Sequence, residues 1–417
     1  MISAGGFAID TIVNGGGTVV VNPGGITSGA TLSGTSGNVA NEFVFVGGAA
    51  FATTVGNFAV LDLGPAGGGL PAGSAFAGGT TIDPGGFELL FGGSLAIATL
   101  VNAGGVELVA SGSTSNTVVN GGVEVIEGPA TGFVFGAAEA FGTTINGGAQ
   151  IVFGEASGTR VNSGFEVVWS GAFSDGATIN AGGFDFVVGI AFNQVLNGGT
   201  EFVISGGFAQ FFQVNSGSVQ VVSSGSEVAS GIINGGVQVL SSGAVDEATE
   251  VRGTQIIAGG TTAGVDIVFG GEQIVEAGGI ASNSLIDGGI MDVVSGGSTG
   301  ATPVSFTSMG GDLQLDFSQG FKGTIAGFAS PPGVIEEIDL RDIVFSNITL
   351  GSFTEAPGGT SGTLTVTDGT HTANLTLLGQ YSTANFIIAS DGNGGTIVTD
   401  PPALVGSAAS PVLAAHA

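Results

Sequence analysis

Carboxylate and carboxamide side chains recur at one position of a repeated pattern, Gly-Gly (or an equivalent pair), any residue, a polar residue and two apolar residues. Stacked carboxylates could share a divalent cation, because hard cations prefer several carboxylate oxygens. Stacked carboxamides could instead hydrogen bond to one another, as amide ladders do in cross-β structures. We call this the ladder position. Its twelve residues are Glu88, Glu107, Glu124, Gln150, Glu166, Asp185, Glu201, Gln220, Gln238, Gln255, Gln273 and Asp292.

The acidic and the amide members suggest different roles. The acidic set could form an outward, solvated face that keeps the protein soluble, or a stripe that binds Ca²⁺; no other cofactor is predicted. It comprises Glu88, Glu107, Glu124, Glu166, Asp185 and Glu201. The amide set is predicted to form a structural ladder of side-chain hydrogen bonds. It comprises Gln150, Gln220, Gln238, Gln255 and Gln273.

Short β-strands must hold these residues in place. Ladder positions recur about every 18 residues, with one insertion at 127–136. Runs of three to five β-branched and aromatic residues are bounded by Gly, Ser and Asn, and helical periodicity is absent. One such unit cannot bury its apolar face alone, whereas stacked units can. We predict an all-β fold, a parallel β-helix (β-solenoid) with rungs of about 18 residues, and we interpret the Gly-Gly pairs as its corners.

Composition excludes several classes of function. The chain has 33 acidic and four basic residues, for a formal charge of -29, so it would repel nucleic acid. It has no cysteine, which excludes disulfides and thiolate metal sites. No apolar run reaches about 18 residues, so we do not expect an integral membrane protein. The first residues lack the basic and apolar regions of a cleavable signal.

The repeat also suggests domain boundaries. Residues 82–308 carry the regular repeat. Residues 1–81 have the same Gly-rich turns and short apolar runs but no regular period, which suggests irregular initial rungs or an N-terminal cap. The pattern changes at residue 309. Residues 362–378 alternate like a β-hairpin around Asp368 and Gly369, so we predict a C-terminal β-rich module at 309–402. Residues 403–417 are predicted to be a flexible tail.

Phenylalanine is concentrated between residues 133 and 212. Sugar-binding platforms favour Trp and Tyr, of which this chain has one each. We therefore predict that these phenylalanines stack in the core.

The repeats resemble a known family. The stretch NGGVQVLSSGAVDEATEV (234–251) is similar to the strand-loop-strand repeats in passenger regions of AIDA-type autotransporter adhesins, whose units read approximately xGGxQxVxxGGxAxxTxV. The resemblance covers 82–297 and is clearest after residue 215. It implies a right-handed parallel β-helix outside a Gram-negative cell that serves adhesion, autoaggregation or biofilm formation. IDLRDIVF (338–345) and GTLTVTDGTHTANLTLLGQY (362–381) resemble a terminal module of large secreted α-proteobacterial proteins.

The chain also departs from that family. Autotransporters carry a C-terminal membrane β-barrel, for which this chain has no room. We therefore expect an export partner in trans, or a chain that is one piece of a larger protein. The family usually has Gln at the ladder position, whereas five of the first six aligned units here have Glu or Asp.

An enzyme is the alternative class, because parallel β-helices also host polysaccharide lyases and hydrolases. Their sites need clustered carboxylates beside a Lys or Arg. Arg160 and Arg252 lie about five rungs apart in the aligned repeat, too far for one site. The stretch 296–300 fits G-x-S-x-G, but no helix is predicted after it, and the only histidines are His371 and His416. We predict that the chain is not an enzyme; a carbohydrate-active β-helix enzyme or its non-catalytic stalk remains the alternative.

These observations favour a secreted or cell-surface, outer-membrane-associated structural or adhesive rod. It would act through multivalent display rather than through one pocket. The predicted partners are a host or abiotic surface, glycans, or further copies of the same chain.

Overall fold

The computed structural model describes residues 1–64, 74–128, 138–329, 332–348 and 350–400. These residues form 52 β-strands and three short 3-10 helices, which confirms the all-β class. The strands build a parallel β-solenoid with rungs of about 19 residues, one more than predicted. The tail at 403–417 and most of the insertion at 127–136 lie outside the described residues. The chain divides into two compact units, Met1–Phe212 and Gln213–Ala417.

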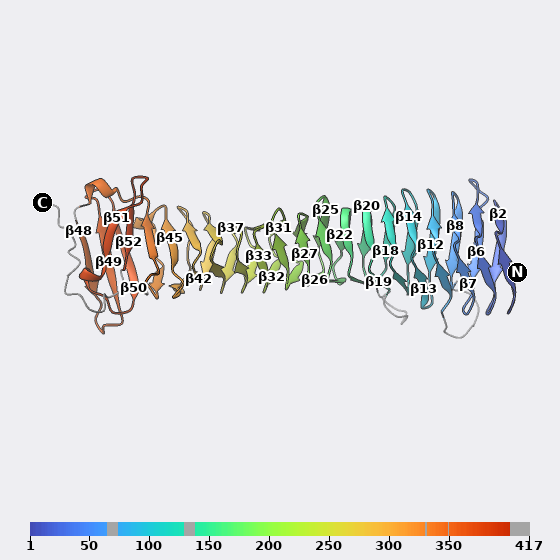
Figure 1. The fold of residues 1–417 in the computed structure, drawn as a ribbon, viewed down its shortest axis with the longest axis horizontal. Helices are drawn as coiled ribbons and strands as arrows, with labels where there is room; N and C mark the ends of the chain where they lie inside the picture. The colour runs from blue at the N-terminus through green and yellow to red at the C-terminus, as the bar shows by residue number, and fades with distance from the viewer. Residues whose placement is uncertain (65–73, 129–137, 330–331, 349, 401–417) are drawn as a thin grey trace. The chain divides into compact units, whose positions relative to one another are not determined.

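Each rung of the first unit has three short strands, and each strand pairs in parallel with its equivalent in the next rung (Figure 1). The first strands are β1 (Phe7–Ile9), β4 (Ile26–Ser28), β7 (Ala49–Phe51), β10 (Phe76–Gly78), β13 (Ser94–Ile97), β16 (Gly112–Ser115), β19 (Glu139–Phe141), β21 (Glu155–Ser157), β23 (Phe173–Asp175), β26 (Ile190–Phe192) and β29 (Phe208–Gln210). The second strands are β2 (Ile12–Asn14), β5 (Thr31–Ser33), β8 (Thr54–Val55), β11 (Thr81–Ile82), β14 (Leu100–Asn102), β17 (Val118–Asn120), β24 (Thr178–Asn180) and β27 (Val195–Asn197).

The third strands of the first unit carry its ladder positions. They are β3 (Thr18–Val21), β6 (Ala40–Val44), β9 (Ala59–Leu63), β12 (Gly86–Leu90), β15 (Val106–Val109), β18 (Val123–Ile126), β25 (Gly183–Val187) and β28 (Thr200–Val203). Two longer strands, β20 (Thr144–Val152) and β22 (Arg160–Val168), supply the second and third strands of their rungs together. In-register pairing places equivalent residues of successive rungs directly above one another.

The second unit repeats this arrangement. Its first strands are β32 (Glu227–Ala229), β35 (Val245–Glu247), β38 (Thr261–Ala263) and β41 (Ile280–Ser282). Its second strands are β30 (Gln213–Asn215), β33 (Ile232–Asn234), β36 (Glu250–Val251), β39 (Asp266–Val268), β42 (Leu285–Asp287), β44 (Val304–Phe306) and β46 (Thr324–Ala326). Its third strands are β31 (Val219–Val222), β34 (Val237–Ser241), β37 (Thr254–Ala258), β40 (Glu272–Val275), β43 (Ile290–Val293), β45 (Gly311–Leu315) and β47 (Glu336–Leu340).

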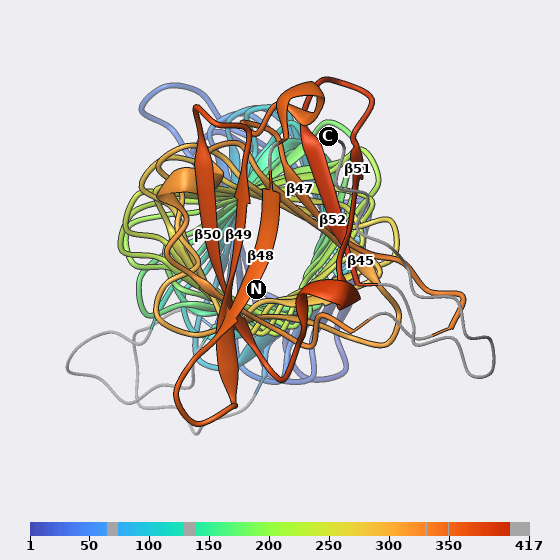
Figure 2. The same ribbon diagram turned by 90° about the vertical axis from the view of Figure 1, so that its left-hand side faces the viewer.

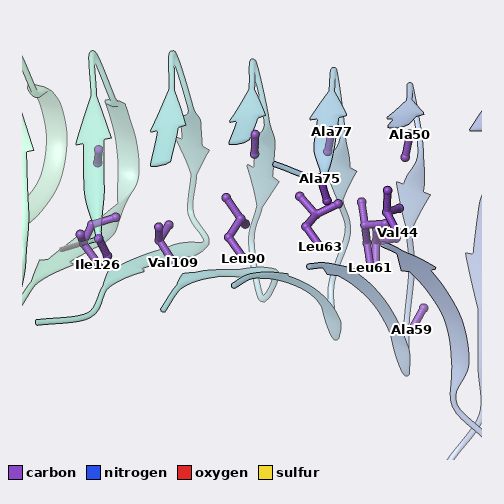
Figure 3. Close-up of a cluster of buried hydrophobic side chains, with 14 of the residues drawn as sticks. Val44, Ala50, Ala59, Leu61, Leu63, Ala75, Ala77, Leu90, Val109 and Ile126 are labelled. Carbon is purple, nitrogen blue, oxygen red and sulfur yellow. The ribbon is translucent and has the colours of Figure 1, made fainter. Parts of the chain in front are cut away.

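The core of each rung lies between its strands. In the first unit, Leu61, Leu90 and Val109 project inward from third strands, toward Ala50 and Ala77 of the first strands (Figure 3). All five are essentially inaccessible to solvent. Fully burying a side chain such as Leu or Val contributes about 1.5–3 kcal/mol, so the stacked columns are the main source of cohesion between rungs.

The Gly-Gly pairs form corners, as predicted, and each glycine of a pair meets a different structural requirement. The first glycine has positive φ, for example 81° at Gly104 and 80° at Gly121. The second permits close approach to the preceding rung: a Cβ on Gly105 would lie 2.7 Å from the Ile82 carbonyl oxygen. Only glycine meets both requirements without strain.

The rungs extend beyond the limits expected from the sequence. Residues before 82, where irregular rungs or a cap were expected, already pair in register from β1 onward. Parallel pairing also continues past residue 309, because β45 pairs with β43 and β47 pairs with β45. Solenoid rungs therefore reach Leu340.

Antiparallel strands follow the last of these rungs in the second unit. β48 (Leu350–Glu355), β49 (Ser361–Thr367) and β50 (Thr372–Leu378) lie side by side, with β49 and β50 forming the predicted hairpin (Figure 2). β50 joins β46 in parallel, and β47 pairs antiparallel with β52 (Thr396–Thr399), which pairs with β51 (Ile387–Ser390). The 3-10 helices are η1 (Ser318–Gly320), η2 (Phe345–Asn347) and η3 (Thr383–Asn385).

Candidate functional site

The acidic residues at the ladder position point into the first unit. Pairing of consecutive third strands stacks them one per rung, in the order Glu88, Glu107, Glu124, Gln150, Glu166, Asp185 and Glu201. All seven are completely buried. The prediction of an outward, solvated acidic face is therefore wrong. The cause is strand alternation: the flanking residues, such as Phe87 and Leu89, take the outward positions instead.

Buried hydroxyl groups from the first strands, and from the corners just ahead of the second strands, meet this acidic column. The Thr80 and Thr99 hydroxyls each donate to Glu88 over 3.1 Å. Glu124 accepts hydrogen bonds from Thr114 and Thr143, both at 2.9 Å. Each ladder carboxyl in these rungs is therefore solvated by protein hydroxyls in place of water.

Hydroxyl donors do not satisfy every carboxyl oxygen. Glu107 accepts from Thr117 over 3.0 Å through Oε2, but its Oε1 is buried without a hydrogen-bond partner. Glu166 accepts from Ser174 over 3.1 Å through Oε1, while its Oε2 also lacks a partner. A neutral carboxylic acid carries an O–H donor and so resembles a carboxamide, whereas a carboxylate can only accept. The stack therefore favours the protonated form.

Burial is the main cause of a rise in the pKa of these groups. It raises the pKa of Glu88 and of Glu166 to about 7, against opposing hydrogen bonds from threonine and serine. The pKa of Glu107 rises well above its usual value, first through burial and then through the neighbouring Glu124 and Glu88 carboxyls. Asp185 behaves similarly, between Glu166 and Glu201. At neutral pH the column holds protons that water-exposed carboxylates would have lost.

The amide residues of the second unit form the hydrogen-bonded ladder that the sequence suggested. Gln238 donates to Gln220, Gln255 to Gln238 and Gln273 to Gln255, each over 2.7 Å and each buried. Gln150 differs, because it lies in the first unit between Glu124 and Glu166 and donates to Glu124 over 2.9 Å.

The sequence alignment of the last repeat, which contains Asp292, was one residue out of register. Gln273 pairs with Met291, not with Asp292, so the ladder position there is apolar and Met291 is buried. Asp292 faces outward and forms an ion pair with Arg341 at 3.0 Å. An extra residue between the glycine pair and the aspartate, in GGIMDV, is the signal that distinguishes it from GGVQVL.

Sequence reasoning missed several buried acids, among them Glu42 and Asp246. Glu42 is fully buried in β6 and accepts from Thr27 over 2.5 Å and Thr53 over 3.3 Å; no Gly-Gly pair precedes it. Asp246 is buried on a first strand, where it accepts from Thr249 over 2.6 Å and Gln255 over 2.5 Å. Burial raises the pKa of Asp246 to about 7.

A second, solvent-exposed ladder runs along the corners of the first unit. Asn146 donates to Asn120 over 3.2 Å, Asn162 to Asn146 over 2.9 Å and Asn180 to Asn162 over 2.8 Å. These asparagines lie at the ends of strands, next to the glycines of the corners. The same asparagines also tie successive corners together.

The calcium stripe remains a prediction. Within the described ranges, no group of three or more His, Asp or Glu side chains is arranged to hold a metal ion. If the acidic column does bind Ca²⁺, millimolar calcium should raise the melting midpoint, and replacing Glu107 and Glu124 by Gln should remove that rise. An unchanged midpoint in a calcium titration, followed by fluorescence, would eliminate the stripe.

The residues considered for catalysis have structural partners or are dispersed. Arg252 pairs with Glu250 in the second unit, whereas Arg160 lies in β22 of the first. His371 lies 2.9 Å from Asp368, which also caps the hairpin turn by accepting from the Thr370 and His371 amides. Thr299, inside the G-x-S-x-G stretch, is buried. The next element after that stretch in the described residues is the strand β44, not a helix. His416 lies outside the described residues.

The phenylalanines of the first unit are mostly on its surface, so the prediction of stacked core phenylalanines is wrong. Phe141, Phe153, Phe165 and Phe184 are each 40–45 % exposed. Phe212 is the large buried exception. Phe141, Phe165 and Phe184 occupy outward positions of strands whose inward positions hold alanine, valine or the ladder carboxyls, and Phe153 follows the end of β20.

The outward positions of the third strands form a largely apolar surface from β12 to β28, where Thr200 is the polar exception. Consecutive pairing aligns them in two columns. The first column is Phe87, Val106, Val123, Ala149, Phe165 and Phe184. The second is Leu89, Leu108, Val125, Ile151, Val167, Phe186 and Phe202. We call these residues the outer apolar stripe. Apart from Ala149 they are half-buried or exposed, and none is charged.

The fold, the buried acidic column and the outer apolar stripe define a β-solenoid protein. Its third strands carry carboxyls on the inside and apolar side chains on the outside. No protein-family model and no curated protein matches the chain. Among solved structures it is similar to the TibC-catalysed hyper-glycosylated TibA55–350 fragment, with 25 % identity over 79 % of this chain and 95 % of that chain and a TM-score of 0.46. It is also similar to a tailspike mutant of E. coli bacteriophage HK620, with 11 % identity over 92 % and 84 % of the chains and a TM-score of 0.27. No helix of the described residues is long and apolar enough to span a bilayer.

Proposed function

We propose that this chain is a secreted or cell-surface structural and adhesive protein of a Gram-negative bacterium. It would act by presenting repeated weak contacts along its β-solenoid. The observation that carries the proposal is the outer apolar stripe, because a soluble protein normally places apolar side chains inside and charges outside. The third strands of the first unit instead place apolar side chains on both faces and their ladder carboxyls inside. The resemblance of its repeats to adhesin passenger repeats supports the same conclusion.

The chemistry of the third strands suits contact rather than catalysis. The ladder carboxyls of the third strands are sealed inside the rungs, with Glu88, Glu107 and Glu124 inaccessible to solvent. A substrate on the surface would meet Phe, Leu, Val and Ile side chains instead. We therefore propose a non-enzymatic role, which incubation with bacterial and host polysaccharides tests: release of reducing ends or unsaturated sugars would contradict it.

Cell display tests adhesion directly. The chain is fused to a heterologous outer-membrane translocator on a non-adherent strain, and settling and retention on glass, polystyrene and epithelial cells are measured. Deleting residues 88–123 joins Phe87 to Glu124 and removes two rungs while keeping the register. We expect displaying cells to clump or attach, and the shortened chain to do so with reduced avidity, because avidity depends on the number of contacts. Loss of all attachment with the deletion, at equal display, would indicate one discrete site instead.

A further inference from the structure

A buried threonine and a buried glutamine of the same rung are in contact in the second unit. Thr262 lies on the first strand β38 and Gln273 on the third strand β40, and both side chains are inaccessible to solvent. The Gln273 amide nitrogen lies 3.4 Å from the Thr262 hydroxyl oxygen. Groups held about 3–3.5 Å apart can react with effective concentrations of about 10⁵–10⁸ M. The rung therefore holds a nucleophile beside a carboxamide.

Gln273 differs from the two ladder glutamines before it, because hydroxyl groups lie at both ends of its amide. In the described residues, the hydrogen bonds of Gln238 and Gln255 go to glutamine and aspartate side chains. The Ser284 hydroxyl donates to the Gln273 oxygen over 3.0 Å, and the Gln273 nitrogen donates to Gln255 over 2.7 Å. These contacts fix the amide. They also place a donor at the oxygen where negative charge develops during attack on the carbonyl carbon.

A carboxyl group lies one rung before the threonine. Asp246 pairs in register with Thr262, so the two side chains project inward from neighbouring strands about 4.8 Å apart. Each Asp246 oxygen accepts one hydrogen bond, from Thr249 or Gln255, and keeps a second lone pair. Burial raises the pKa of Asp246 to about 7, which suits a group that takes up a proton and returns it. Among the described hydrogen bonds the Thr262 hydroxyl only accepts, so its proton is available to Asp246.

We propose that the Thr262 hydroxyl and the Gln273 carboxamide form an ester cross-link with loss of ammonia, and that Asp246 is the general base. The Thr262 oxygen bonds to the side-chain carbonyl carbon of Gln273 while its proton passes to Asp246. The Ser284 hydroxyl stabilises the resulting oxyanion. The carbon–nitrogen bond then breaks, the nitrogen takes the proton back from Asp246, and ammonia leaves. These side chains supply every atom and proton, so no other reactant is needed.

Burial favours the cross-linked product. Ammonia escapes to solvent and is diluted, which drives the reaction forward. Hydrolysis of the ester needs water, and Thr262, Gln273, Asp246 and Ser284 are all inaccessible to solvent. The ester should therefore persist once it has formed.

Another buried threonine–glutamine contact has the opposite polarity. In the first unit the Thr159 hydroxyl donates to the Gln150 oxygen over 2.9 Å. Its proton points at the carbonyl oxygen, and the hydroxyl is not directed at a base. We expect no ester there, which makes Thr159 a matched control for Thr262.

The cross-link is a covalent brace in a chain that has no cysteine and so no disulfide. It joins the first and third strands of one rung through residues 11 positions apart. The second unit would then resist unfolding when the protein is pulled. This inference goes beyond the proposed adhesive function and does not depend on it, because contacts on the surface do not require a cross-link inside.

Mass spectrometry of the purified full chain tests the cross-link. After folding and incubation at mildly alkaline pH, the native chain should lose the mass of one ammonia molecule. Proteolysis after Glu272 places Thr262 and Gln273 on separate peptides, which only the cross-link keeps together. Hydroxylamine, which cleaves esters, should then separate them. A native chain that keeps its full mass, or that loses ammonia without linked peptides, would overturn the proposal.

Substitutions assign the roles of the residues. Thr262→Val removes the nucleophile at nearly constant volume, so the linked peptides should vanish, whereas Thr262→Ser should still form them. Asp246→Asn should slow linkage at least about 100-fold, because a general base typically contributes about 10²–10⁴-fold. Thr159→Val should leave linkage unchanged. Linkage that survives Thr262→Val, or that disappears with Thr159→Val, would overturn the assignment. Circular dichroism checks that the variants fold, and the linked peptides of the native chain test the ester whether or not they do.

Discussion

The free energy of unfolding of the first unit should fall as pH rises from about 4.5 through about 7. Below about 4.5 the ladder carboxyls are protonated in both the folded and the unfolded chain. Above that value the unfolded chain ionises while the buried groups keep their protons until the folded pKa, about 7 for Glu88 and Glu166. A group whose pKa is raised in the folded chain therefore contributes less and less to the free energy of unfolding as pH rises across this window.

The expected effect is large because several groups titrate together. Each pH unit across the window costs about 1.4 kcal/mol per group, so Glu88 alone accounts for roughly 3 kcal/mol. Urea unfolding followed by fluorescence measures it selectively, because Trp169 is the single tryptophan and lies in the first unit. Stability that is flat or rises with pH would show that the column is ionised in the folded state.

Glu107→Gln isolates one member of the column. Glutamine is neutral at every pH and keeps an oxygen to accept from Thr117, while its amide can donate to a neighbouring ladder carboxyl. We expect the variant to have a higher free energy of unfolding than the native chain at pH 8, and almost the same free energy of unfolding at pH 4.5. Destabilisation at pH 8 would mean that the Glu107 carboxylate is stabilised by something the described contacts lack.

The stacking of these residues could be predicted from the regular repeat, whereas their direction was predicted wrongly. Periodic glycine pairs determine the corners, and the corners determine which residues of successive rungs pair, which is why Glu88 and Glu107 were correctly placed one rung apart. The predicted direction was wrong because the general pattern of polar residues outside and apolar residues inside does not hold at the ladder position. In GFELL, both neighbours of Glu88 are apolar, so alternation alone left its direction open.

A signal for the inward direction was present in the sequence. A threonine recurs eight residues before Glu88 and Glu107 and seven before Glu124, just ahead of each second strand. These threonines, Thr80, Thr99 and Thr117, are buried hydroxyl donors to ladder carboxyls. Two polar columns at a fixed spacing in the sequence indicate side chains that hydrogen bond to each other inside a solenoid, rather than two separate solvated faces. The exposed phenylalanines follow from strand alternation, because the residues flanking an inward carboxyl must point outward.

The amide ladder should respond to charge in the opposite sense to the acidic column. Gln255 is its central member: its amide donates to Gln238 over 2.7 Å and to Asp246 over 2.5 Å, and its oxygen accepts from Gln273 over 2.7 Å. Gln255→Glu removes both donated bonds and, once ionised, opposes the Asp246 carboxyl in a fully buried site. Breaking such a network costs about 3–5 kcal/mol.

We therefore expect Gln255→Glu to destabilise the second unit by at least about 3 kcal/mol at pH 8, and by less at pH 4.5, where both acids are protonated and one can donate again. Hydrogen exchange of the β34, β37 and β40 amides measures this, because Trp169 does not report on the second unit. The paired result matters most: Glu107→Gln stabilising and Gln255→Glu destabilising at the same pH would show that the ladder position favours a neutral donor-acceptor side chain. If both substitutions were tolerated equally, the ladder contacts would contribute little, and apolar stacking alone would hold the rungs.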